Sequence, residues 1–117
     1  MNIPHQEPVK FAKELLEVND EFVKVKCAFD SLPSLAMFFE AAAQSSAGFS
    51  QEEEAKVGFL ISLKEVKLNK EADTLEYIIK VEKKIAFASV CEFYFEVYDL
   101  SETTNYATGI LTVMIQE

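Results

Sequence analysis

Arginine is absent from this chain, and histidine, cysteine, glycine and proline are scarce: its 117 residues include one His, two Cys, three Gly and three Pro. Without arginine there is no guanidinium group to hold a phosphate through two parallel hydrogen bonds. The net charge of −9 repels nucleic acid and anionic membrane surfaces alike. We therefore expect no nucleic-acid partner.

The two cysteines also exclude several kinds of site. Cys27 and Cys91 lie far apart and have neither the paired spacing nor the neighbouring histidine of a zinc site or a redox motif. We expect two reduced core thiols, no metal and no cofactor. The N-terminus lacks the basic start and apolar run of a secretory signal, so a cytoplasmic location is the default expectation. The segment 31–51 approaches the length of a membrane span but contains Pro33, Glu40, Gln44 and five serines, so we predict no membrane segment.

The chain is rich in apolar and aromatic residues. Half of its residues are hydrophobic, and they include ten Phe and four Tyr. This content is enough to offset the entropy lost on ordering a chain of this length. We predict one domain that covers residues 1–117.

The hydrophobic pattern predicts strands at both ends of the chain. Residues 9–18 form an irregular first strand, and the alternation that begins at Glu21 indicates a half-buried partner strand. After a helical segment, four more strands are predicted, at 56–68, 75–82, 85–98 and 106–115. The strand 85–98 has an apolar row at odd positions and a partly apolar second face, which another layer or subunit would cover.

Between the second and third predicted strands, residues 33–49 have the composition of a helix. Pro33 suits the first turn, Ser31 or Ser34 can cap it, and alanine, leucine and methionine favour its propagation. Because this helix is apolar on nearly all sides, we expect other elements to wrap it. The fold class is therefore α+β, with an antiparallel sheet of five or six strands around one central helix. Its open edges favour a symmetric homodimer.

Glu40 is the only charged residue between Asp30 and Glu52. An ionised carboxylate is expensive to remove from water, so a buried Glu40 marks either a structural network or a chemical site. Gln44 lies four residues further on, shares a helix face with Glu40 and could orient it by a hydrogen bond. We expect burial to keep the Glu40 carboxyl group partly protonated near neutral pH, as proton transfer to or from an acyl chain requires.

The helix sequence FFEAAAQSSAG at 38–48 resembles the Glu-Ala-x-Ala-Gln motif of the hotdog-fold beta-hydroxyacyl-acyl carrier protein dehydratases. Residues 3–8 are similar to the early Pro-His-x-x-Pro segment of that family, and residues 107–109 to its small-residue last strand. The resemblance implies a hotdog fold and a catalytic Glu40. In the family a histidine from a Gly-His-Phe-Pro loop acts with this glutamate across a dimer interface. Here the corresponding segment, 27–33, is shorter and has no histidine.

Several side chains could complete such a site. His5 is the only imidazole, and it either replaces the missing histidine or has a turn or packing role. Asp30 is either a second carboxylate or an exposed acid beside the helix. The backbone N–H groups at 33–36 could polarise a thioester carbonyl, as every helix N-terminus could.

The resemblance implies an acyl-thioester-binding protein with dehydratase-type activity in fatty-acid or polyene-like metabolism. Its substrate would be carried by acyl carrier protein or coenzyme A. The alternatives are an acyl thioesterase, in which the helix carboxylate acts without histidine, and a non-catalytic acyl-binding or interaction module. Because acyl carrier proteins are acidic, docking would need local basic clusters. The candidates are Lys64, Lys67 and Lys70, or Lys80, Lys83 and Lys84.

Overall fold

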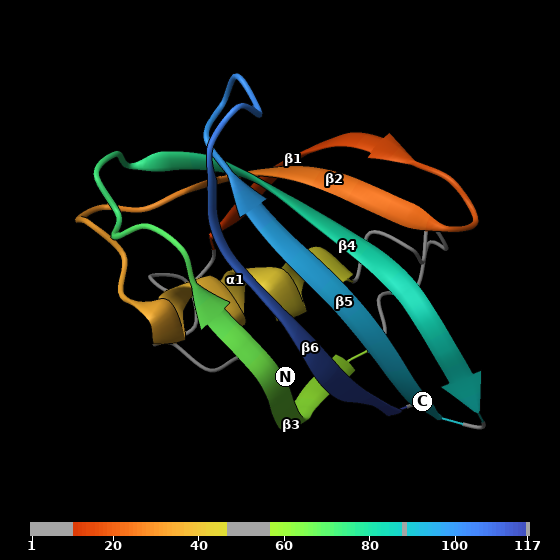
Figure 1. Cartoon of the computed structure of the whole chain (residues 1–117). Coiled ribbons are helices and arrows are strands. Elements are labelled where there is room, and N and C mark those ends of the chain that lie inside the picture. The colour runs from red at the N-terminus through yellow and green to blue at the C-terminus, as the bar shows by residue number, and fades with distance from the viewer. Residues whose placement is uncertain (1–10, 47–56, 88, 117) are drawn as a thin grey trace.

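The computed structural model describes residues 11–46, 57–87 and 89–116, which form one antiparallel sheet and one helix (Figure 1). The elements follow the order β1 (Ala12–Val18), β2 (Phe22–Ala28), α1 (Leu35–Ser46), β3 (Val57–Leu68), β4 (Glu76–Phe87), β5 (Val90–Tyr98) and β6 (Asn105–Gln116). The strand order in the sheet is β1-β2-β4-β5-β6-β3. Figure 1 shows the sheet curving around α1. The predicted α+β architecture is confirmed, with the larger of the two expected strand numbers among the described residues.

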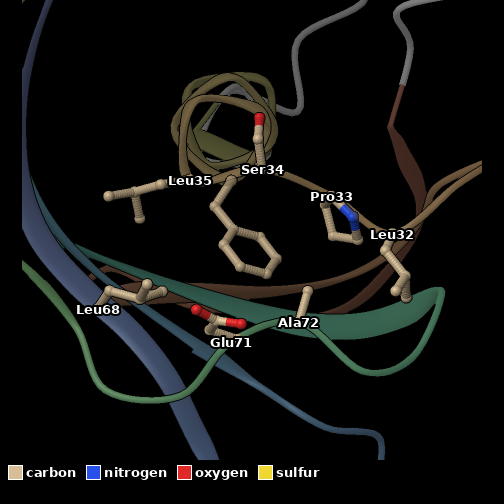
Figure 2. A pocket seen from close by; sticks show the side chains of 8 residues that line it. Leu32, Pro33, Ser34, Leu35, Leu68, Glu71 and Ala72 are labelled. Atoms are coloured by element: carbon tan, nitrogen blue, oxygen red, sulfur yellow. The ribbon is translucent and has the colours of Figure 1, made fainter.

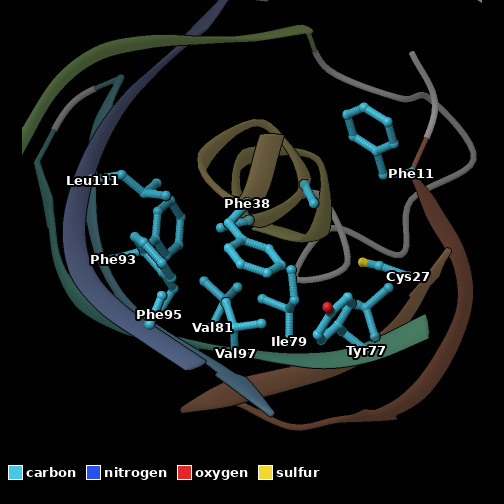
Figure 3. Close-up of a cluster of buried hydrophobic side chains, with 14 of the residues drawn as sticks. Phe11, Cys27, Phe38, Tyr77, Ile79, Val81, Phe93, Phe95, Val97 and Leu111 are labelled. Atoms are coloured by element: carbon cyan, nitrogen blue, oxygen red, sulfur yellow. The ribbon is translucent and has the colours of Figure 1, made fainter. Parts of the chain in front are cut away.

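The core lies between α1 and the concave face of the sheet (Figure 3). Alternate residues of β2 and β5 are buried, as the period of two in their sequences predicts. Cross-strand pairing continues the apolar rows, since Val25 pairs with Ile79 and Val81 pairs with Phe95. Within the described ranges, no helix has the length and apolar character needed to cross a membrane.

The boundary between β4 and β5 differs from the prediction of one strand over 85–98. The Lys83–Lys84 pair was expected between two strands, but β4 continues through both lysines to Phe87, and β5 begins at Val90. The backbone of a lysine can form the hydrogen bonds of a β-sheet while its side chain remains in water. A bulge between Lys83 and Ile85 also breaks the alternation. Ile85 and Phe87 are therefore 59% and 79% exposed instead of continuing the buried row.

The helix begins two residues later than predicted, at Leu35, and is more exposed than predicted. Ser34 is its cap, since its Oγ accepts a hydrogen bond of 3.2 Å from the backbone N–H of Met37, so Pro33 precedes the helix. The predicted end at 47–49 lies outside the described residues. The helix residues that face the sheet are buried: Phe38, Ala41, Ala42, Ser45 and Ser46. Ala36 and Glu40 are exposed, so the prediction of a helix covered on nearly all sides is wrong for the single chain.

Gly109 in β6 lies where two side chains approach the backbone closely. A Cβ atom at this position would lie 2.9 Å from Cε2 of Phe95 and 3.3 Å from Cγ2 of Val66. Val66 reaches it through a bulge in β3 between Lys64 and Lys67, where Glu65 has a φ of 53°. The close approach of Phe95 and Val66 therefore explains why position 109, in the small-residue segment 107–109, is a glycine.

Replacing Gly109 with alanine is expected to lower the free energy of unfolding by about 1–3 kcal/mol, because the new methyl group would overlap the fully buried ring of Phe95 and force a shift in the core. Urea denaturation followed by circular dichroism would measure the loss. Thr112→Ala, a change in the same strand at a half-buried position, is the control and should cost less. A Gly109→Ala protein as stable as the wild type would show that this contact is not tight.

Candidate functional site

Glu40 lies on the face of α1 that points away from the sheet. At 100° per residue, its side chain is almost opposite Phe38 and Ser45, which are buried. The side chain of Glu40 is exposed in the single chain. The prediction that Glu40 is withdrawn from water is therefore wrong for one copy alone, because the sheet encloses only one side of the helix.

Gln44 connects the helix to the first strand. Its Oε1 accepts hydrogen bonds of 2.7 Å from the backbone N–H of Phe11 and 3.1 Å from that of Ala12, the residue at which β1 begins. Any hydrogen bond from Gln44 to Glu40 would therefore come from the amide nitrogen. The sequence motif identified Gln44, but spacing along the helix gave no sign of this contact with β1.

Replacing Gln44 with methionine is expected to lower the free energy of unfolding by about 1–3 kcal/mol, because two backbone donors next to the buried Phe11 lose their acceptor. Gln44→Glu keeps oxygens that can accept both bonds and should lose less. Chemical denaturation of the three proteins measures the difference. Equal losses in both variants would mean that the accepting oxygen is not what matters at this position.

The two other candidate side chains are Asp30 and His5, and only Asp30 belongs to the described part of the chain. Asp30 is exposed in the segment between β2 and α1, in agreement with the interpretation of an exposed acid beside the helix. His5 lies outside the described residues, which contain no other imidazole. Its predicted roles remain predictions.

A pocket of about 240 Å³ lies on another side of α1, where the helix begins (Figure 2). Its walls come from the segment before the helix, the first turn of α1, the end of β3 and the β3–β4 loop. The lining residues are Leu32, Pro33, Ser34, Leu35, Phe38, Leu68, Glu71 and Ala72. Glu40 is not among them, so the predicted acid and this pocket lie on different faces of the helix.

The β3–β4 loop that forms one wall is fixed by hydrogen bonds to the sheet. The hydroxyl of Tyr106 donates a hydrogen bond of 2.6 Å to Asp73, and the ammonium group of Lys70 lies 3.1 Å from the other oxygen of the same carboxylate. These contacts hold the pKa of Asp73 below its ordinary value and raise that of Tyr106. The backbone N–H of Thr74 also donates to the hydroxyl of Tyr77, at 3.2 Å. The pocket wall is therefore preformed.

The remaining polar groups offer little further chemistry. The Cys27 thiol is buried against the Ser45 hydroxyl at 3.6 Å, and burial raises the pKa of Cys27 to about 11, so it is protonated at neutral pH. No group of three or more metal-ligating side chains occurs in the described part of the chain. Both predicted lysine clusters contain engaged members: Lys64 pairs with Glu92 at 3.0 Å, and Lys80 lies over the ring of Phe22.

Solved structures with the same architecture identify the fold. A dehydratase heterocomplex, ApeI:P from Xenorhabdus doucetiae, is similar over 98% of this chain and 88% of that chain, with a TM-score of 0.78 and 18% identity. Zebrafish thioesterase superfamily member 2 is similar over 98% and 89%, with a TM-score of 0.73 and 12% identity. A Streptococcus mutans protein bound to acetyl CoA is similar over 98% and 97%, with a TM-score of 0.70 and 11% identity. The sequence matches no family model and no curated protein.

These similarities, together with the strand order, show that the chain has the hotdog fold. The fold implied by the helix motif is therefore confirmed. Proteins of this fold include a dehydratase and a thioesterase, and one of those named above binds an acyl-CoA. The fold alone does not decide what this chain binds or which reaction it carries out; the residues of the site must decide that.

Proposed function

We propose that this chain is a homodimeric hotdog protein that binds an acyl thioester of coenzyme A or acyl carrier protein and carries out dehydratase-type chemistry at Glu40. The observation that carries the proposal is the position of Glu40: it is the only charged residue of the helix, and it lies on the helix face that the sheet leaves open among the described residues. All 117 residues would act as one domain.

A second copy would give Glu40 the enclosed environment that catalysis requires. The free edges of the sheet are β1 and β3, and the open face of α1 presents the small side chain of Ala36 beside Glu40. A copy that pairs with a free edge could also cover this helix face. Light scattering on purified protein should then give about twice the chain mass of 13.2 kDa.

The chemistry proposed for Glu40 is proton transfer. Its carboxylate accepts a proton from C2 of a 3-hydroxyacyl thioester, the C2–C3 double bond forms, and the C3–O bond breaks. The departing hydroxyl takes up a proton and leaves as water. The proton that the departing hydroxyl takes up is donated by the Glu40 carboxylic acid or by a second acid. His5 of the partner copy is the candidate for this second acid.

Two other functions remain candidates, each with its own support. The similarity to a thioesterase supports hydrolysis, in which Glu40 activates water or attacks the thioester carbonyl. The segment 27–33, which has no histidine where the resembling dehydratases have their Gly-His-Phe-Pro loop, supports a non-catalytic acyl-binding module. The heterocomplex among the similar structures also raises the prospect of a partner of different sequence that completes the site.

A panel of thioesters distinguishes these functions. Purified protein would be incubated with enoyl, 3-hydroxyacyl and saturated acyl thioesters of coenzyme A and of acyl carrier protein. Hydration of the enoyl substrate that is lost in Glu40→Gln supports the dehydratase, and release of free thiol supports the thioesterase. Saturable binding without turnover supports the binding module. Failure to bind any thioester would overturn the proposal.

A further inference from the structure

One edge of the sheet is formed by β1, which has β2 on one side and no other described strand beyond it (Figure 1). A strand at an edge carries backbone N–H and C=O groups that can pair with a further strand. All residues of β1 from position 13 to position 17 are exposed. Two of them are leucines, Leu15 at 41% and Leu16 at 43% exposure. Exposed apolar side chains on an open edge favour association with other strands, so this edge needs protection.

Two bulges interrupt the pairing of β1 with β2. The register shifts once between Ala12 and Glu14 and again between Leu15 and Glu17, so positions 13 and 16 hold the extra residues. No more than two consecutive residues of β1 therefore keep the same register. In an antiparallel pair, only every second residue directs its N–H and C=O groups to a given side of the strand. A regular run of two thus offers an incoming strand a single pairing residue.

The strand at the other edge, β3, is interrupted less often. Its residues Val57 to Leu60 pair with β6 without a shift, and so do Ser62 to Lys64. The regular runs of β3 are thus four and three residues long, whereas those of β1 do not exceed two. Of the two edges of the described sheet, β3 is the one with room for a ladder of hydrogen bonds.

A hydrogen-bond acceptor and two charged side chains protect the rest of β1. Oε1 of Gln44 binds the backbone N–H groups of Phe11 and Ala12 at 2.7 and 3.1 Å, so these two donors are already engaged where β1 begins. Further along the strand, the exposed carboxylates of Glu14 and Glu17 would lose water if another strand lay beside them. Charged side chains are a common protection of sheet edges.

We propose that β1 is a closed edge: its two bulges, its charged side chains and its contact with Gln44 together prevent a further strand from pairing there. A chain with two receptive edges could join β1 of one copy to β3 of the next and grow into an open row. With β1 closed, pairing through the sheet is confined to β3 and ends at two copies. The inference rests on the proposed function only for the dimer, and it does not depend on the chemistry of Glu40.

The test restores a regular edge. Deleting Lys13 and Leu16 removes the two extra residues, and each remaining residue of β1 keeps its partner in β2. Glu14→Thr and Glu17→Thr then replace the charges with a residue that favours strands. This combined variant should form particles larger than two copies, with a mass by light scattering that rises with protein concentration. The wild type should not exceed twice the chain mass of 13.2 kDa.

Glu76→Thr together with Glu82→Thr is the matched control. Both glutamates lie in β4, which has a neighbouring strand on each side, so this variant loses the same number of carboxylates without changing an edge. Its mass should equal that of the wild type. Far-ultraviolet circular dichroism shows whether each variant is folded.

Amide hydrogen exchange on the wild-type protein tests the same point without any substitution. The amides of β1 that do not bond to β2 should exchange quickly at every protein concentration, because no strand covers them. If the combined variant does not fold, this measurement decides.

Three results would overturn the inference: protection of these amides that increases with concentration, a folded combined variant with the mass of the wild type, or a control that grows as the combined variant does. A monomeric wild type with an unprotected β1 would refute the dimer of the proposed function and support the closed edge.

Discussion

Replacing Tyr77 with alanine is expected to lower the free energy of unfolding by about 3–5 kcal/mol, the range for removing a buried aromatic ring. Tyr77 is fully buried and is the largest of the completely enclosed side chains. Its ring contacts those of Phe29, Phe38 and Tyr106 edge-on, with centroids 5.8, 5.0 and 5.0 Å away. The cavity left by alanine would thus open in β4 between Phe29, the helix residue Phe38 and the β6 residue Tyr106.

Tyr77→Phe separates the ring from its hydroxyl. Phenylalanine keeps the three ring contacts and loses only the hydrogen bond that the hydroxyl accepts from Thr74, so the expected cost is about 0.5–1.5 kcal/mol. Urea denaturation followed by circular dichroism gives both values. If both variants lost the same amount, the hydroxyl and not the ring cluster would be the main source of stability at this position.

The sequence predicted the fold well wherever one face of an element is buried. The alternation in β2 is regular because Val23, Val25 and Cys27 all face the core. The helix segment was predicted from composition and from its motif, and the cap at Ser34 was one of two candidates. These features depend on short-range geometry, which a sequence carries directly.

The predictions failed where contacts between residues far apart in the sequence determine the local structure. No periodicity shows that β4 continues through Lys83 and Lys84, because its pairing with β5 determines where the strand ends. The loop after β3 is attached to β6 by the hydrogen bond between Tyr106 and Asp73, which spans 33 residues. The pocket that this loop helps to form was therefore not predictable from local sequence.

Glu40 shows the limit of composition as a guide to burial. An apolar segment indicates that a helix will be covered, but it does not say which chain covers it. The sheet of the single chain covers the face with Phe38 and Ala41 and leaves Ala36 and Glu40 exposed. An apolar helix with an exposed face is a physical argument for a second subunit that covers this face. The sequence pattern alone could not distinguish burial by a second subunit from burial within one chain.

Replacing Glu40 with glutamine is expected to lower kcat for enoyl-thioester hydration by about 10²–10⁴-fold, the usual contribution of a positioned acid or base. Glutamine has nearly the same shape but cannot accept and return a proton. Because the side chain is exposed in the single chain, the free energy of unfolding of one copy should change by less than about 0.5 kcal/mol. Glu14→Gln, an exposed glutamate of β1, is the matched control and should retain full activity.

The comparison of rate, stability and oligomeric state decides what Glu40 does. A lost rate with an intact dimer means that the carboxylate does chemistry, since a residue that only supports the interface would weaken the dimer as well. A lost rate with dissociation assigns Glu40 to the contact between copies. An unchanged rate in an intact dimer would contradict the catalytic assignment and direct the search for the acid to other residues.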